Sequence, residues 1–232
     1  MTDWNETATF DQYAGHYDDS INQALSLSGE NRDYFAKKRI EWLARCISRL
    51  DHHPNLVMDF GCGTGTASNL IFDTIGAKEY VGVDTSPKSL EFASKTRPGR
   101  VCERSQYEPH GEVDLVYCNG VFHHIPLDQR ADALDYLYKS IRPGGLFALW
   151  ENNPLNPATR YMMSRIPFDR DAITLTSKTA KNLVQSHGFD VLRTDHLFLF
   201  PRWLSPFRRF ERHLSALPLG AQYQVLCQKP LR

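Results

Sequence analysis

The fold is decided by the stretch Leu56-Val57-Met58-Asp59-Phe60-Gly61-Cys62-Gly63-Thr64-Gly65. An apolar run that ends in a carboxylate, followed by glycine at every second position, predicts a buried parallel strand and then a tight turn. The glycines let the backbone turn sharply and let a ligand lie against the main chain. Beyond the turn, apolar residues recur at helical spacing: Ala67, Leu70, Ile71 and Ile75. The sequence therefore predicts strand, turn and helix, the first half of a nucleotide-binding βαβ unit.

A second carboxylate completes this unit. The short apolar strand Tyr80-Val81-Gly82-Val83-Asp84 ends about 20 residues beyond the glycine loop, where an acidic residue can accept hydrogen bonds from both hydroxyls of a ribose. The loop spacing is G-x-G-x-G with Asp59 before it, and it differs from the dinucleotide fingerprint G-x-G-x-x-G. A carboxylate at this place would repel a pyrophosphate at the helix N-terminus, but it would attract an amine and a sulfonium.

The pattern from Asp59 to Gly65 resembles the first motif, D-x-G-C-G-T-G, of the class I S-adenosylmethionine-dependent methyltransferases. The resemblance is close to the type 11 and type 12 families and covers roughly residues 50–150, through Val81–Asp84 and Asp114–Val116 to Arg142–Gly145. It implies an α/β fold with a Rossmann-like, seven-stranded, mostly parallel sheet. The final strand would be antiparallel, helices would cover both faces, and small insertions would form a cap. The cofactor would be S-adenosylmethionine, and the product S-adenosylhomocysteine.

Length and composition suit a single domain. The chain has 232 residues, 41% of them hydrophobic, and no formal net charge, so no global field recruits nucleic acid. We expect residues 1–50 to form N-terminal lid or helical segments, 51–151 the cofactor-binding core, and 152–174 and 201–220 acceptor-side insertions. Five scattered cysteines without a C-x-x-C pair indicate a reducing compartment. With neither a secretion signal nor a long apolar stretch, the sequence predicts a cytoplasmic protein.

The resemblance places the cofactor on the glycine loop and on the end of the second strand: Asp59, Gly61, Cys62, Gly63, Gly65, Asp84 and Thr85. Related enzymes often bind the adenine amine with a carboxylate after the third strand, and here Ser105 or Gln106 would substitute for it. Asn119 ends the fourth strand and would meet the methionine moiety. Tyr13 and Tyr17 would either form a lid over that moiety or dock an N-terminal helix on the domain.

The loop after the fourth strand holds the candidate bases His123 and His124. A histidine can accept a proton near neutral pH, and since neighbouring residues point in different directions, at most one of the two would be catalytic. The alternative is that one ring only packs or caps a helix. Glu151 follows the fifth strand and would bind a substrate hydroxyl, assist its deprotonation, or be a solvated strand end. No metal-ligand pattern is evident, so no metal is expected.

The two insertions would shape the acceptor side. Residues 152–174 contain a predicted short helix in which Arg160 would hold an anionic group. Residues 201–220 place Trp203 and other apolar residues at helical spacing among four arginines. This pattern fits a helix that lies on a membrane or grips a phosphorylated lipid, or a stripe that covers the core while the arginines face water. We therefore expect O-methylation of a small molecule, a sugar or a lipid-linked acceptor.

Two other functions remain open. A nicotinamide-dependent oxidoreductase is disfavoured by the glycine spacing and by Asp59. A non-catalytic cofactor-binding or scaffold protein of the same fold would carry the same motifs. A nucleic-acid methyltransferase is less expected, because Asn119-Gly120-Val121-Phe122 differs from the Asn-Pro-Pro-aromatic motif of amino-group DNA methylation, and the neutral charge gives no surface that tracks phosphates.

Overall fold

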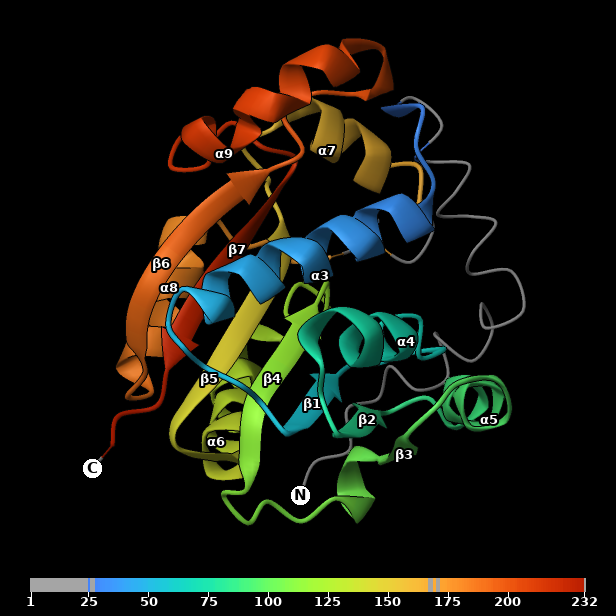
Figure 1. Cartoon of the computed structure of the whole chain (residues 1–232), viewed down its shortest axis with the longest axis vertical. Coiled ribbons are helices and arrows are strands. Elements are labelled where there is room, and N and C mark those ends of the chain that lie inside the picture. The colour runs from blue at the N-terminus through green and yellow to red at the C-terminus, as the bar shows by residue number, and fades with distance from the viewer. Residues whose placement is uncertain (1–24, 26–27, 167–168, 170–171, 232) are drawn as a thin grey trace.

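A computed structural model describes residues 25, 28–166, 169 and 172–231. At its centre is a seven-stranded sheet in the order β3-β2-β1-β4-β5-β7-β6 (Figure 1). Its strands are β1 (Leu56–Phe60), β2 (Glu79–Asp84), β3 (Arg100–Glu103), β4 (Val113–Asn119), β5 (Ile141–Asn152), β6 (Asp190–Leu197) and β7 (Gln222–Gln228). The first five strands are parallel, and β7 runs antiparallel between β5 and β6. The predicted fold class, with its antiparallel final strand, is confirmed.

Helices cover both faces of the sheet, as the side chains of β4 show. Leu115 and Tyr117 pack with α3 (Arg32–Ser48), while Val116 and Cys118 pack with α6 (Arg130–Ser140) and α8 (Ser177–Ser186). This alternation is the period of a strand that is buried on both sides. In Figure 1, α3 crosses in front of the sheet and α6 and α8 lie behind it. The helix α5 (Pro87–Thr96) lies against β2 and β3.

Local capping signals explain where two helices begin. The hydroxyl of Ser86 accepts a hydrogen bond from the backbone N–H of Ser89, and Pro87 occupies the first turn of α5. Thr176 caps α8 in the same way, and Gly188, at φ +85°, lies just beyond the end of that helix.

The segment after the glycine loop is more irregular than its spacing predicts. A single helical turn, α4 (Ser68–Leu70), passes into the π-helical turn η2 (Ile71–Ile75), which ends at Gly76 with φ +79°. The apolar spacing nevertheless serves its expected purpose, since Ile71 is fully buried against the face of the sheet that carries α3.

The second insertion is not one amphipathic helix. It consists of the 3₁₀ segment η6 (Arg202–Phe210), kinked at Leu204, and the short helix α9 (Glu211–Leu214). Pro206 lies inside η6, where it has no N–H to donate to a regular helix. No residue of η6 is buried, so its apolar side chains do not cover the core.

Three elements form one layer above the sheet in Figure 1: α7 (Pro157–Met163), η6 and α9. We call residues 153–166 and 198–221 the cap. Asn153 joins its two parts, because the side-chain amide donates to the carbonyls of Pro218 and Gly220. Among the described residues, no helix combines the length and apolarity needed to cross a bilayer.

Candidate active site

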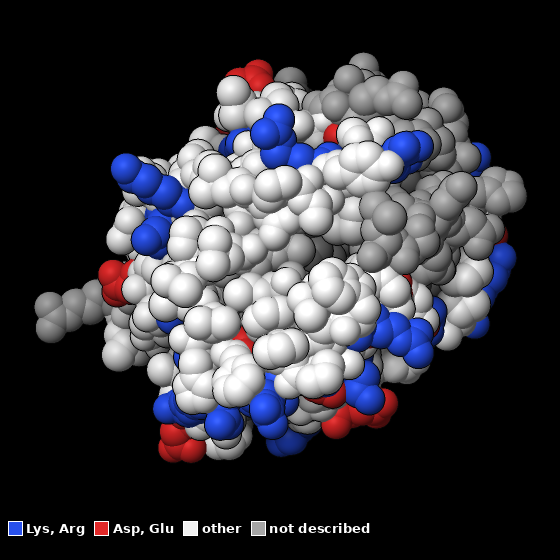
Figure 2. Space-filling model, turned by 90° about the horizontal axis from the view of Figure 1, so that it is seen from above, with Lys and Arg blue, Asp and Glu red and all other residues white. Residues whose placement is uncertain are grey.

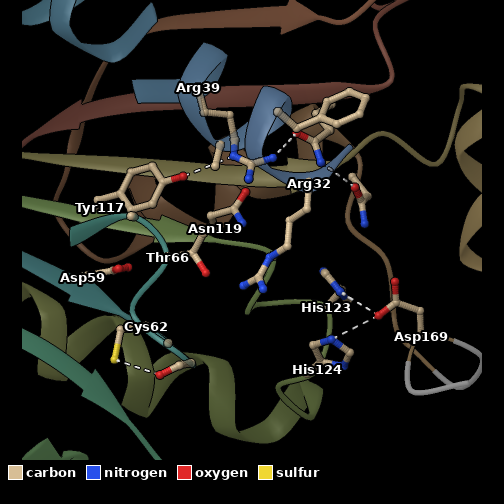
Figure 3. A pocket seen from close by; sticks show the side chains of 18 of the residues that line it. Arg32, Arg39, Asp59, Cys62, Thr66, Tyr117, Asn119, His123, His124 and Asp169 are labelled. Atoms are coloured by element: carbon tan, nitrogen blue, oxygen red, sulfur yellow. Dashed lines mark hydrogen bonds and ion pairs between the residues drawn. The ribbon is translucent and has the colours of Figure 1, made fainter. Parts of the chain in front are cut away.

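A pocket lies over the carboxyl ends of β1 and β4 and encloses about 1080 Å³, its open mouth included (Figure 3). Here the strand order changes direction, because β1 is followed along the chain by β2 on one side and is paired with β4 on the other. Ligands of open α/β sheets bind in the crevice at such a switch point. The glycine loop, α3 and the loop after β4 line the pocket, together with Ile166 and Asp169.

The glycine loop presents its backbone to this pocket. The N–H groups of Gly61 and Cys62 donate to the carbonyl of Val83, at 2.7 and 3.2 Å, and hold the loop over the end of β2. Gly61 has φ +74°, and a Cβ there would lie 2.3 Å from the side chain of Val121. A Cβ on Gly63 would meet no atom within 4 Å. The main chain at Gly63 is therefore open to a ligand.

Asp59 lies at the base of the pocket, 3% exposed (Figure 3). Burial raises the pKa of its carboxyl to about 7, against the opposing hydrogen bond of 3.0 Å from the hydroxyl of Tyr80. Asp84, at the end of β2, accepts from the backbone N–H groups of Gly63 (2.7 Å) and Ser86 (2.8 Å). Each carboxylate oxygen can accept a second hydrogen bond.

These groups fit S-adenosylmethionine, the cofactor that the sequence implies. Asp59 offers a negative charge to an ammonium group or a sulfonium. The open main chain at Gly63 lets a ligand approach closely, and Asp84 stands where the ribose hydroxyls are expected. Asn119, from the end of β4, lines the same pocket.

The opposite wall is basic and comes from α3. Arg39, 7% exposed, donates to the hydroxyl of Tyr117 at 3.2 Å and to the side-chain carbonyl of Gln222 at 2.9 Å, and both partners are neutral. Arg32 extends from the same helix into the space between Thr66 and His123 (Figure 3). The pocket thus has an acidic base at Asp59 and a basic wall at α3.

A buried cluster of histidines and carboxylates closes the far side. His123 Nδ1 lies 2.5 Å from Glu151 Oε2, and His123 Nε2 lies 3.6 Å from Asp169 Oδ1. His124 Nε2 lies 3.3 Å from that same oxygen of Asp169 (Figure 3). Glu151 also accepts from the backbone N–H of Phe122 at 2.7 Å. All four side chains come from segments after β4, at the end of β5 and after α7.

The charges of this cluster are strongly coupled. Burial opposes a charge on His123, but the carboxylates of Glu151 and Asp169 outweigh it and raise the pKa of His123 to about 10. Burial would raise the pKa of Asp169, yet hydrogen bonds from the two histidines hold it at about 2. At neutral pH His123 therefore already holds a second proton when no other cation is present. Its predicted role as a base stays a prediction, which this geometry does not favour.

The structure brings many of the expected site residues to one pocket: Asp59, Gly61, Cys62, Gly63, Asn119, His123 and His124. Other predicted residues are not among those that line it: Gly65, Asp84, Thr85, Ser105, Gln106, Glu151 and Arg160. Ser105 and Gln106 are exposed on η3 (Arg104–Gln106), and Arg160 is exposed on α7. Glu151 is 2% exposed, so it is not a solvated strand end. Tyr13 and Tyr17 lie outside the described residues.

Three contributors were not foreseen from the sequence: Arg32, Tyr80 and Asp169. Arg32 stands seven positions before Arg39, a spacing that places both on one helix face and could have signalled a shared wall. Tyr80 looks like an ordinary strand residue. No sequence pattern near Asp169 indicates a site, because its partners His123 and His124 come before β5 in the sequence and Asp169 comes after it.

Comparison with known proteins agrees with this geometry. A family model described as a methyltransferase domain matches residues 58–147. Trans-aconitate 2-methyltransferase of Methylobacterium radiotolerans is 29% identical over 136 residues, which make up 57% of this chain and 52% of that protein. The chain thus spans about half the length of such curated relatives.

Solved structures show the same fold at low sequence identity. A S-adenosylmethionine-dependent methyltransferase of Thermotoga maritima, described as a possible histamine N-methyltransferase, has a TM-score of 0.66 at 18% identity, covering 95% of this chain and 97% of that one. The cyclase SpnF has a TM-score of 0.58 at 13% identity, covering 83% of this chain and 81% of that one. The core around the glycine loop is thus similar to a methyltransferase domain, and the sheet has the fold of class I S-adenosylmethionine-dependent methyltransferases.

Proposed function

We propose that the chain transfers the methyl group of S-adenosylmethionine to an oxygen atom of a small, anionic acceptor. The observation that carries this proposal is the pocket itself, which has Asp59 and the open glycine loop at its base and Arg32 and Arg39 on its wall. When bound, the cofactor supplies a methyl group that its sulfonium already makes electrophilic. The residues of this chain then have to hold two reactants in line and exclude water, and such positioning is a large source of rate enhancement.

The basic wall supports an anionic acceptor. Both arginines come from one helix, and the described hydrogen bonds of Arg39 go to the neutral side chains of Tyr117 and Gln222. A guanidinium suits a carboxylate because its donors match the two oxygens in one plane. Trans-aconitate, the acceptor in the name of the curated relatives, is itself a carboxylate. It is the first compound to test.

An acceptor carried on a lipid is the second candidate, and the cap favours it. Seven of the thirteen exposed large apolar side chains among the described residues belong to the cap: Leu155, Tyr161, Trp203, Phe207, Phe210, Leu217 and Leu219. Figure 2 looks down on this end, where lysine and arginine side chains surround a broad uncharged surface. Apolar side chains among arginines suit the interface of an anionic membrane. A lipid-linked acceptor could reach the pocket from there.

A methyl-transfer assay with isotopically labelled S-adenosylmethionine tests both candidates. The acceptor panel contains trans-aconitate, other small polycarboxylates, acidic sugars, and sugars linked to a polyprenyl phosphate. With the accepted compound, Arg32→Gln should raise the KM for the acceptor with a smaller change in kcat, because the arginine binds and does not react. Arg45→Gln is the matched control, since Arg45 is exposed on the same helix. Arg160→Gln tests the arginine that the sequence suggested.

Calorimetry with S-adenosylhomocysteine separates the remaining alternatives. Binding without turnover on the whole panel would support the non-catalytic cofactor-binding protein. Binding of NADH in place of S-adenosylhomocysteine would overturn the proposal in favour of an oxidoreductase.

A further inference from the structure

The cluster of His123, His124 and Asp169 has the composition and spacing of a metal site. Each residue offers one ligand atom, and these atoms all lie within 4.8 Å of one another. Asp169 Oδ1 is 3.3 Å from His124 Nε2 and 3.6 Å from His123 Nε2. Two ligand atoms bound tetrahedrally to Zn²⁺ at about 2.0–2.1 Å lie about 3.3 Å apart. These two separations therefore fit a common ion with little movement of the side chains.

Glu151 sets the orientation that such a ligand needs. One of its oxygens lies 2.5 Å from His123 Nδ1, and the other accepts from the backbone N–H of Phe122 at 2.7 Å. The carboxylate is 2% exposed and held at both oxygens, so it fixes the imidazole ring with Nε2 directed at Asp169. Histidines that bind metals generally donate their other nitrogen to a carboxylate or a carbonyl in this way.

Two buried carboxylates flank His123 in this cluster. The carboxylates of Glu151 and Asp169 are 2% and 8% exposed, and His123 lies between them at 3%. If His123 donates from Nδ1 to Glu151 and is neutral, the lone pair of Nε2 faces a carboxylate oxygen. That arrangement is repulsive unless a proton or a metal ion lies between the two atoms. With a proton on each Nε2, both histidines donate to Asp169, and one ion bound to all three residues would take the place of these two protons.

We propose that His123, His124 and Asp169 bind one divalent transition-metal ion of the Zn²⁺ type, with Glu151 as a positioning residue. Two imidazoles and one carboxylate suit such an ion better than Mg²⁺ or Ca²⁺, which prefer oxygen ligands. All three ligands line the same pocket as Asn119 and Arg32, so an ion held by them would face that pocket. There the ion would hold an oxygen of the acceptor, a role that rests on the proposed function. The binding of the ion does not rest on it.

The test is the titration of the metal-free, folded chain with Co²⁺, which replaces Zn²⁺ and absorbs visible light when tetrahedrally coordinated. The wild type should bind one Co²⁺ per chain and show this absorption, without the intense charge-transfer band of a thiolate ligand. His124→Gln and Asp169→Asn should abolish the absorption. Glu151→Gln should retain it with an affinity about 10- to 100-fold weaker, as expected when the group that orients a ligand is altered.

The chain offers a matched control for the adjacent histidines. His53 is also preceded by a histidine and lies 3.2 Å from Asp51, but both side chains are exposed. His53→Gln should therefore bind Co²⁺ like the wild type. Circular dichroism must show that every variant is folded.

Two results would overturn the metal site. One is a folded wild type that binds no Co²⁺, and the other is equal binding by the wild type, His124→Gln and Asp169→Asn. Methyl transfer by a metal-free chain that binds no ion would refute this inference and leave the proposed function intact. Stoichiometric Co²⁺ binding by a chain that transfers no methyl group would refute the proposed function and leave this inference intact.

Discussion

Replacing Asp59 by asparagine should make the protein more stable at high pH and leave its stability unchanged in mild acid. Burial lifts the pKa of this carboxyl from 3.8 to about 7, so the folded state holds the proton more tightly than the unfolded chain does. The free energy of unfolding of the wild type therefore contains a term that falls as the pH rises between about 4 and about 7. A shift of about three pKa units corresponds to about 4 kcal/mol. Asparagine has the same shape and does not ionise, so it removes this term.

Urea unfolding of the wild type and Asp59→Asn between about pH 4 and pH 8 measures the effect. The difference between the two proteins cancels the other groups that titrate in both. We expect similar unfolding free energies near the acid end and an advantage for the variant that grows with pH. Tyr80→Phe adds a third curve. It removes the hydrogen bond that favours the charged form, so the transition should move to higher pH. Parallel curves for the wild type and Asp59→Asn would refute the assigned pKa.

Cofactor binding should show the opposite trend with pH. S-adenosylhomocysteine carries an ammonium group, and a charged Asp59 attracts it more strongly than a protonated one. Its affinity for the wild type should therefore rise through about pH 7, by up to about tenfold per pH unit, while the affinity of Asp59→Asn should stay flat. Calorimetry at several pH values measures this. A flat wild-type profile would place the ammonium group away from Asp59.

Three further changes test other parts of the structure. Gly61→Ala and Gly76→Ala both put a side chain at positive φ, but only at Gly61 would the Cβ lie 2.3 Å from Val121. Thermal unfolding should therefore show the larger loss of stability for Gly61→Ala. Equal losses of stability would mean that Val121 moves aside. Asp114→Ala leaves two backbone N–H groups without their acceptor and should cost about 1–3 kcal/mol in urea unfolding. Trp203→Ala should change stability by less than about 0.5 kcal/mol, because the side chain is 74% exposed, yet it should weaken sedimentation with anionic vesicles if the cap meets a membrane.

Where local chemistry dictates the backbone, the sequence was a sufficient guide. The glycine loop and the carboxylates at the ends of β1 and β2 lie as expected. Each of these features depends on residues only a few positions apart. The buried strands could also be predicted, because a strand that is covered on both faces is apolar at successive positions.

Where the outcome depends on distant segments, the sequence was a poor guide. Asp169 meets His123 and His124 only because the chain returns across the end of the sheet after α7. The spacing of Trp203 and its apolar neighbours suggested a helix, either on a membrane or lipid or packed on the core, but Pro206 and the kink at Leu204 give a 3₁₀ segment with exposed side chains. Periodicity reports which residues share a face and does not report what that face meets.

The way the second half of the cap joins the sheet has a further consequence. It leaves β6 after Leu197 and returns to β7 at Gln222, and these two residues are paired partners in adjacent strands. The ends of the excursion are therefore fixed by the ladder, whatever lies between them. Closing a longer loop costs only about 0.6 kcal/mol for each doubling of its length. Residues 198–221 should therefore tolerate shortening or extension with little loss of stability while β6 and β7 stay in register.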